Sequence, residues 1–273
     1  MSAPQNPISD SPIPAGPQFH PTLPPAPLPP VENPPWSGWD VVALAFITFF
    51  TVIACIFGTA YVAHARFSPS NPWTDSLKSP GVIVAGQLVA YVLILMLMYT
   101  LVRNHSSGRV LESIRWNWPI NWTLYLAAGI GLAIVLVPLG NVLPMPKNVP
   151  IDEFFRTARD AYVLSLFGVL FAPVFEEVFF RGFLYPVVAR RLGFYPAIVI
   201  TAILFASIHA TQLKYSWGPV LIIFLVGIAL TTVRALKKSL SATILMHMAY
   251  NGTIFISTYI ATDGFRHMEK FNQ

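Results

Sequence analysis

The chain has 273 residues, of which 55% are hydrophobic and only 11% charged, whereas an ordinary soluble domain has roughly 25% charged residues, so the composition predicts a membrane protein. The formal net charge of +5 does not indicate nucleic-acid binding, because the basic residues are scattered one to three at a time between apolar runs and suit positions that flank a membrane. The single cysteine, Cys55, excludes an internal disulfide and a cysteine-cluster metal site.

Residues 1–38 are predicted to form a proline-rich disordered tail. They carry 13 of the 25 prolines and no Lys or Arg. Proline at this density favours extended, solvated chain over helix. The alternative is a docking site for a partner protein that reads proline-rich segments. The tail also lacks the basic region and the apolar core of a cleavable signal peptide.

After Trp39 the apolar runs have the length that a helix needs to cross a hydrocarbon core, which is about 20 residues. They predict an all-α, polytopic transmembrane bundle of about seven spans (six to eight). This bundle forms one membrane domain over residues 39–262, with a short polar tail at 263–273. We expect an integral, multi-pass protein in contact with membrane lipid, in a bacterial inner membrane or the endoplasmic reticulum. The expected spans are 41–63, 81–102, 122–143, 163–189, 195–213, 218–236 and 239–261.

The segment PIDEFFRTARDAY, before the fourth span, is predicted to form a short helix at the membrane interface. Asp152 and Arg156 share one helical face because they are four residues apart. Phe154 and Phe155 supply apolar surface that can enter the headgroup region.

The fourth span contains the stretch FEEVFFRGFLYP, which places ionisable residues at membrane depth. Each costs roughly 2.5–3.5 kcal/mol on insertion scales, so such residues usually face the bundle interior and serve a function. Glu177 and Arg181 are four residues apart and are predicted to form an ion pair. Glu176 has no basic partner on its own helix, so it is the candidate to take a proton from water. Pro173 predicts that the helix opens or kinks just before these acids.

Two histidines lie in later spans. His209 shares a helical face with Phe205, and His247 lies four residues before Asn251. A lone histidine on an apolar helix is more often a hydrogen-bonded core residue, but two of them with an asparagine and an unpaired glutamate indicate a shared site. There Glu176 with His209 can hold and deprotonate a water. His247 and Asn251 can donate hydrogen bonds to the oxyanion that forms when a peptide carbonyl is attacked.

Other chemistries have weaker support. The sequence contains neither HExxH nor G-x-S-x-G, the motifs of common zinc and serine hydrolases. A zinc ion held by Glu176, His209 and His247 stays open, since two histidines and a glutamate form a known catalytic ligand set. No cofactor is assigned, with zinc as the open alternative. A membrane scaffold or a proton-coupled transporter is the non-catalytic alternative, although a transporter should show matching broken helices in two halves.

Three motifs follow one another on hydrophobic helices: Glu176-Glu177-x-x-x-Arg181, Phe205-x-x-x-His209 and His247-x-x-x-Asn251. In this order they resemble the CAAX protease and bacteriocin-processing (CPBP or Abi) family of intramembrane endopeptidases, which includes the type II CAAX prenyl endopeptidases. The resemblance covers residues 150–260, about the C-terminal half of the chain.

The resemblance implies a role for each matching residue. Glu176 would be the catalytic base, His209 its partner on the water, and His247 with Asn251 the oxyanion stabilisers. Early descriptions of the family call it a metalloprotease, while a metal-free, glutamate-dependent mechanism also fits. We favour the metal-free version because His247 and Asn251 make a better donor pair than a ligand pair. The supporting residues of the motifs are Glu177, Arg181 and Phe205.

The resemblance also implies a class of substrate. In eukaryotes the type II enzymes remove the last three residues that follow a prenylated cysteine, and a site inside the membrane suits a lipidated peptide. Bacterial relatives are linked instead to bacteriocin maturation or self-immunity. We therefore expect a prenylated protein, a lipidated CaaX-type peptide or another membrane-associated peptide as substrate, with a non-catalytic immunity role as the alternative.

Overall fold

The structure is a computed structural model that describes residues 1, 32–106, 109–146, 154–155 and 157–267. Throughout this described part every regular element is a helix, as the composition predicts. The helices are α1 (Gly38–Phe67), η1 (Trp73–Lys78), α2 (Pro80–His105), α3 (Val110–Ser113), α4 (Trp122–Leu136), η2 (Val137–Asn141), α5 (Ala158–Leu170), α6 (Ala172–Glu177), η4 (Val178–Leu184), α7 (Tyr185–Leu192), α8 (Phe194–His209), α9 (Trp217–Lys237) and α10 (Leu240–Ala261).

The seven expected spans all coincide with helices. Five helical rods are long and apolar enough to cross a membrane: α1, α2, α4 with η2, the rod from Ala158 to Leu192, and α9. Helix α8 is apolar but has only 16 residues. Helix α10 has 22 residues but is less apolar, because polar residues such as His247 and Asn251 interrupt it. The chain is therefore a multi-pass membrane bundle, with α8 and α10 as its less typical members.

Short local signals set where several helices begin. Ser37 caps α1 and forms a capping box with Asp40, whose carboxylate accepts the Ser37 backbone N–H at 2.7 Å. Ser239 caps α10 by accepting the Ala242 N–H. Gly193 alone joins α7 to α8 with φ +83°, a left-handed conformation that favours glycine. The two helices reverse direction at this residue and pack together.

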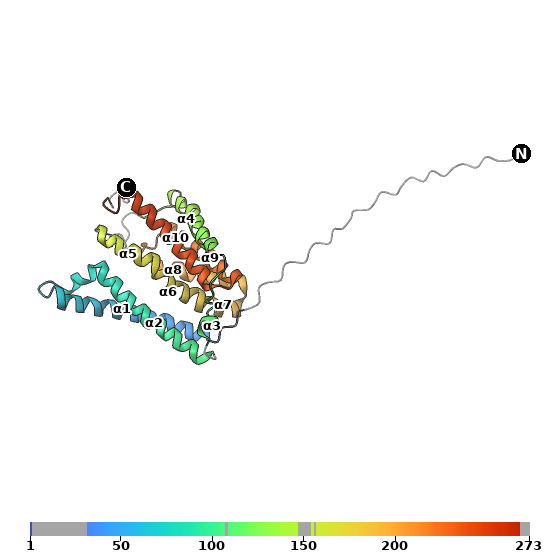
Figure 1. The fold of residues 1–273 in the computed structure, drawn as a ribbon, viewed down its shortest axis with the longest axis horizontal. Coiled ribbons are helices and arrows are strands. Elements are labelled where there is room, and N and C mark those ends of the chain that lie inside the picture. Colours follow the sequence, from blue (N-terminus) through green and yellow to red (C-terminus); the bar gives the residue numbers. More distant parts are fainter. Residues whose placement is uncertain (2–31, 107–108, 147–153, 156, 268–273) are drawn as a thin grey trace.

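The rod from α5 to α7 lies at the centre of the bundle. Figure 1 shows α1 and α2 side by side along one side of the molecule, and α2 packs against α5. On the other side α10 packs against α5 and α6, and it also contacts α4 and α9. Helix α8 packs against α9 and α7. The acids of the fourth span therefore point into protein rather than lipid.

Helices α4 and α10 approach closely at Gly129. A Cβ added there would overlap the backbone oxygen of Met246 and lie 2.8 Å from the Cβ of Ala249. We expect Gly129→Ala to destabilise the protein by about 1–3 kcal/mol through overpacking, measured as the thermal unfolding midpoint in detergent. Gly131→Ala is the control, because nothing lies within 4 Å of its Cβ. Equal midpoints for the two variants would contradict the close approach.

Residues Glu32–Trp36, the N-terminal anchor, are packed onto the bundle. Trp36 is 1% exposed, donates its indole N–H to the Phe183 carbonyl at 3.0 Å and stacks on that ring at 4.5 Å. Glu32 is buried and pairs with Arg234 at 2.9 Å. Arg190 donates to two backbone carbonyls of the anchor. The prediction of a solvated tail up to residue 38 is thus wrong for 32–38, since Gly38 already begins α1, while residues 2–31 lie outside the described part.

Two other predicted segments are described only in part. Part of the expected interfacial helix, residues 150–153 and 156 with Asp152 and Arg156 among them, lies outside the described residues. The end of the same segment, from Ala158 to Tyr162, is the first part of α5, which is capped by the side chain of Thr157. At the other end of the chain, Phe265 is 2% exposed and packs against Tyr259, so the start of the predicted polar C-terminal tail is a packed turn.

Candidate active site

The central rod is interrupted where the acids lie. Helix α5 ends at Leu170 and α6 begins at Ala172, so the predicted opening beside Pro173 is confirmed. After α6 the chain continues as the π-helical segment η4. Stretches of π-helix are rare and occur frequently at functional sites. This irregular segment places Glu177 at its N-terminal border and Arg181 inside it, both with no exposed surface.

The predicted ion pair between Glu177 and Arg181 is present and fully buried. Arg181 Nη1 lies 2.8 Å from Glu177 Oε1. Its other nitrogens donate to α9, to Thr231 Oγ1 at 3.2 Å and to the Gly227 carbonyl at 3.1 Å. The guanidinium also lies 4.5 Å from the centroid of the Phe205 ring. A buried arginine with this many partners keeps its charge, so it can neutralise Glu177 inside the bundle.

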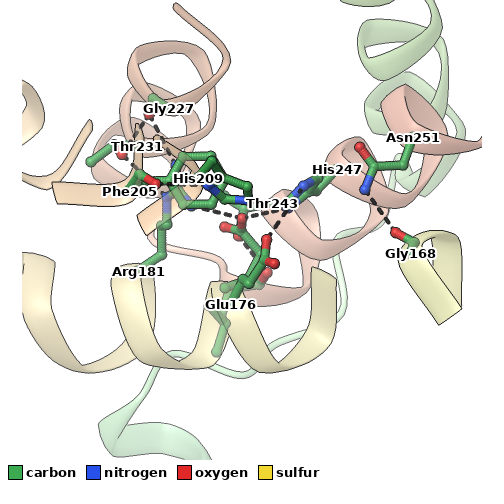
Figure 2. Close-up of polar contacts among 12 residues, drawn as sticks. Gly168, Glu176, Arg181, Phe205, His209, Gly227, Thr231, Thr243, His247 and Asn251 are labelled. Atoms are coloured by element: carbon green, nitrogen blue, oxygen red, sulfur yellow. Dashed lines mark hydrogen bonds and ion pairs between the residues drawn. The ribbon is translucent and has the colours of Figure 1, made fainter. Parts of the chain in front are cut away.

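His247 contacts both glutamates, and Figure 2 shows its ring beside Glu176. Its Nδ1 is 2.8 Å from Glu177 Oε1, and its Nε2 is 3.8 Å from Glu176 Oε2. Because Glu177 accepts a hydrogen bond from Nδ1–H, the ring is held with Nε2 toward Glu176. Glu177 therefore orients His247 as well as pairing with Arg181. Spacing along one helix could not reveal this contact, since the two residues come from different helices.

Hydrogen bonds to backbone carbonyls hold the side chains of His209 and Asn251 in position. The Nδ1 of His209 donates to the Phe205 carbonyl at 3.0 Å, which leaves Nε2 open. Asn251 donates from Nδ2 to the Gly168 carbonyl at 2.7 Å, across from α10 to α5 (Figure 2). One N–H of Asn251 is thus already engaged, and a second hydrogen on the same nitrogen is left.

The four predicted catalytic residues face one cavity of about 700 Å³. Glu176 has 16% of its side chain exposed there, so a water can reach it. Glu176 and His209 are predicted to act together on a water, and both line this cavity, while the side chain that lies close to Glu176 is His247, at 3.8 Å. The rest of the lining is mostly apolar, and much of it comes from α2, α5, α6, α9 and α10: Ile83, Tyr91, Leu164, Phe167, Val169, Ala172, Ile223, Val226, Tyr250, Ile254 and Phe255.

The residues present do not fit a metal ion. Across the residues that the structure describes, no three His, Cys, Asp or Glu side chains are grouped as a metal would require. The set considered from the sequence, Glu176, His209 and His247, shares the cavity, and Glu177 and a backbone carbonyl hold only the Nδ1 atoms of the two histidines, but the three side chains are not gathered around one point as ligands of a metal would be. We derive no step through zinc.

The same region of the chain is similar to a known family. Residues 158–253 match the family described as Rce1-like, type II CAAX prenyl endopeptidase Rce1-like. This match confirms the resemblance that the three motifs predicted, and it includes every proposed catalytic residue. It begins at the start of α5, so the N-terminal anchor and α1 to α4 lie outside it. Neither a curated protein nor a solved structure matches the chain.

Proposed function

We propose that this chain, whose residues 158–253 belong to the Rce1-like family of type II CAAX prenyl endopeptidases, hydrolyses a peptide bond inside the membrane. The family indicates a CAAX-type membrane peptidase. The single observation that carries the assignment of residues is that Glu176, His209, His247 and Asn251 converge on one cavity from three helical rods.

Water activation is the first step of the proposed reaction. Glu176 is the general base, because it is the partly exposed carboxylate of the pair and Arg181 already neutralises the other one. It takes a proton from a water that the open Nε2 of His209 helps to hold. The water oxygen then attacks the carbonyl carbon of the scissile peptide bond.

Stabilisation of the oxyanion is the second requirement. Protonated His247 can donate from Nε2 while Glu177 holds its Nδ1, and the remaining N–H of Asn251 is a further donor. When the tetrahedral intermediate collapses, the C–N bond breaks and the proton held by Glu176 passes to the leaving amine. Glu176 is then a carboxylate again and the cycle is complete.

The substrate that we propose is a lipidated CaaX-type peptide or another membrane-associated peptide. A mostly apolar cavity of about 700 Å³ within a membrane bundle suits a ligand that is itself apolar. A charged soluble peptide would lose its hydration there without gaining a partner for its charges.

The test is cleavage of a fluorogenic farnesylated peptide with a CaaX ending by detergent-purified protein. We expect the wild type to cleave and Glu176→Gln to lose about 10²–10⁴-fold in kcat, because the amide cannot accept the water proton. The matched control is Glu112→Gln, a carboxylate with 69% of its side chain exposed, which should keep full activity.

A chelator arm tests the metal-free mechanism in the same assay. We expect activity to survive chelation. Stoichiometric zinc in the purified protein, with activity lost on chelation and restored by zinc, would contradict this mechanism. Equal cleavage by the wild type and Glu176→Gln would overturn the assignment of the base, and no cleavage by either would favour another substrate or the non-catalytic alternative.

A further inference from the structure

One wall of the cavity comes from a helix outside the family match. Ile83, Gln87 and Tyr91 of α2 are spaced four residues apart, so they form one stripe along the helix, and all three line the cavity. Tyr91 stacks on Phe175, the neighbour of Glu176, with centroids 4.0 Å apart and planes 2° from parallel. The stripe is therefore fixed against the catalytic rod.

Gln87 is the polar member of this stripe. It is half-buried, and its carboxamide makes no hydrogen bond to any described residue. Two polar residues of the proposed site are already engaged: Asn251 donates to the Gly168 carbonyl, and His209 donates to the Phe205 carbonyl. The amide atoms of Gln87 are not among the fully buried polar atoms without a partner, so they are accessible and free to pair with a ligand in the cavity.

The dimensions of the cavity suit a short extended peptide. From Ile83 to Tyr91 the stripe on α2 runs about 12 Å, and from His247 to Thr258 the facing stripe on α10 runs about 16 Å, at 1.5 Å per residue. An extended peptide advances about 3.3 Å per residue, so three to five residues fill this length. Their backbone N–H and C=O groups need partners once they leave water.

The carboxamide of Gln87 suits a peptide group better than it suits a lipid chain or a charged group. It is neutral, and it offers both a donor and an acceptor, which match the acceptor and donor of a peptide group. A prenyl chain can use neither the donor nor the acceptor. A carboxylate on the ligand would bind more strongly to a cationic side chain than to a neutral amide. The chemistry of Gln87 therefore matches the peptide part of a substrate rather than its lipid.

We propose that Gln87 binds the backbone of the substrate peptide and thereby sets its affinity for the cavity. This inference rests on the proposed peptidase function. It adds α2 to the substrate-binding surface, although the helix lies outside the residues that match the family. Gln87 holds the peptide within reach of Glu176 and takes no part in the proton transfers.

The first experiment measures binding without cleavage. In the Glu176→Gln protein, a fluorescent farnesylated peptide should bind about tenfold more weakly when Gln87→Leu is added, since one hydrogen-bonded peptide group is lost. Thr100→Val is the matched control, because Thr100 is on the same helix, exposed and bonded to its own backbone. Gln87→Leu should not lower the thermal midpoint, because the amide has no partner in the protein to lose.

The second experiment measures kinetics and finds the peptide group involved. In the active protein, Gln87→Leu should raise KM about tenfold with little change in kcat. A series of substrates, each with one backbone amide replaced by an ester, locates this peptide group. One ester should bind the wild type more weakly than the parent peptide does, and for that ester Gln87→Leu should cause no further loss of affinity. The inference is overturned if the proteins with and without Gln87→Leu bind the peptide equally well, or if Thr100→Val weakens binding as much as Gln87→Leu does. If the wild type binds the peptide but does not cleave it, the proposed peptidase function fails, and the binding experiment still decides the role of Gln87.

Discussion

Arg181→Ala is expected to destabilise the bundle by about 3–5 kcal/mol, because it leaves the Glu177 carboxylate charged, buried and without its cation. Both side chains of this pair are 0% exposed, so no solvent can replace the guanidinium. The variant also loses the hydrogen bonds that Arg181 donates to Thr231 and Gly227 on α9. The measurement is thermal unfolding in detergent, together with the fraction of monodisperse protein on size exclusion.

The exposed pair of Arg109 and Glu112 supplies the control for this variant. Its side chains are 76% and 69% exposed, so Arg109→Ala should cost less than about 1 kcal/mol. If Arg181→Ala unfolds no earlier than Arg109→Ala, the buried pair does not hold the structure. The double variant Glu177→Gln with Arg181→Met should recover part of the stability, because no charge is left unpaired. It should stay inactive, since glutamine no longer holds His247 as the carboxylate does.

Trp36→Ala is expected to have an effect of similar size, about 3–5 kcal/mol, because it empties a filled site in the core. The side chain is 1% exposed, stacks on Phe183 and donates to its carbonyl. Phe183 belongs to η4, the π-helical segment that also carries Arg181. Loss of the tryptophan should therefore lower activity along with the unfolding midpoint.

Trp39 is the matched control for the anchor. It lies three residues later, at the start of α1, and is 78% exposed, so Trp39→Ala should change the unfolding midpoint little. Trp36→Phe should recover part of the loss, because phenylalanine keeps a ring against Phe183 but cannot donate to its carbonyl. If Trp36→Ala and Trp39→Ala behave alike, residues 32–36 do not anchor the chain, and the first helix is held by its own packing against α2.

Local sequence was sufficient for the features that depend on local physics. The positions of the helices follow from apolar runs, because backbone groups inside a bilayer must bond within the chain and a helix achieves this by itself. The ion pair of Glu177 and Arg181 follows from the four-residue spacing on one helix. The opening beside Pro173 follows from its missing N–H. The order of the three motifs was sufficient to indicate the family.

Only the tertiary structure decided which residues meet between helices. The contact of His247 with Glu177, the bond from Asn251 to Gly168, and the place of Gln87 in the cavity depend on how separate helices pack. Periodicity gives the face of a helix and not the neighbour of that face. The N-terminal anchor shows the same limit. Its proline-rich composition predicts an extended chain, but it does not show that the bundle has a site for Trp36 and an arginine that pairs with Glu32.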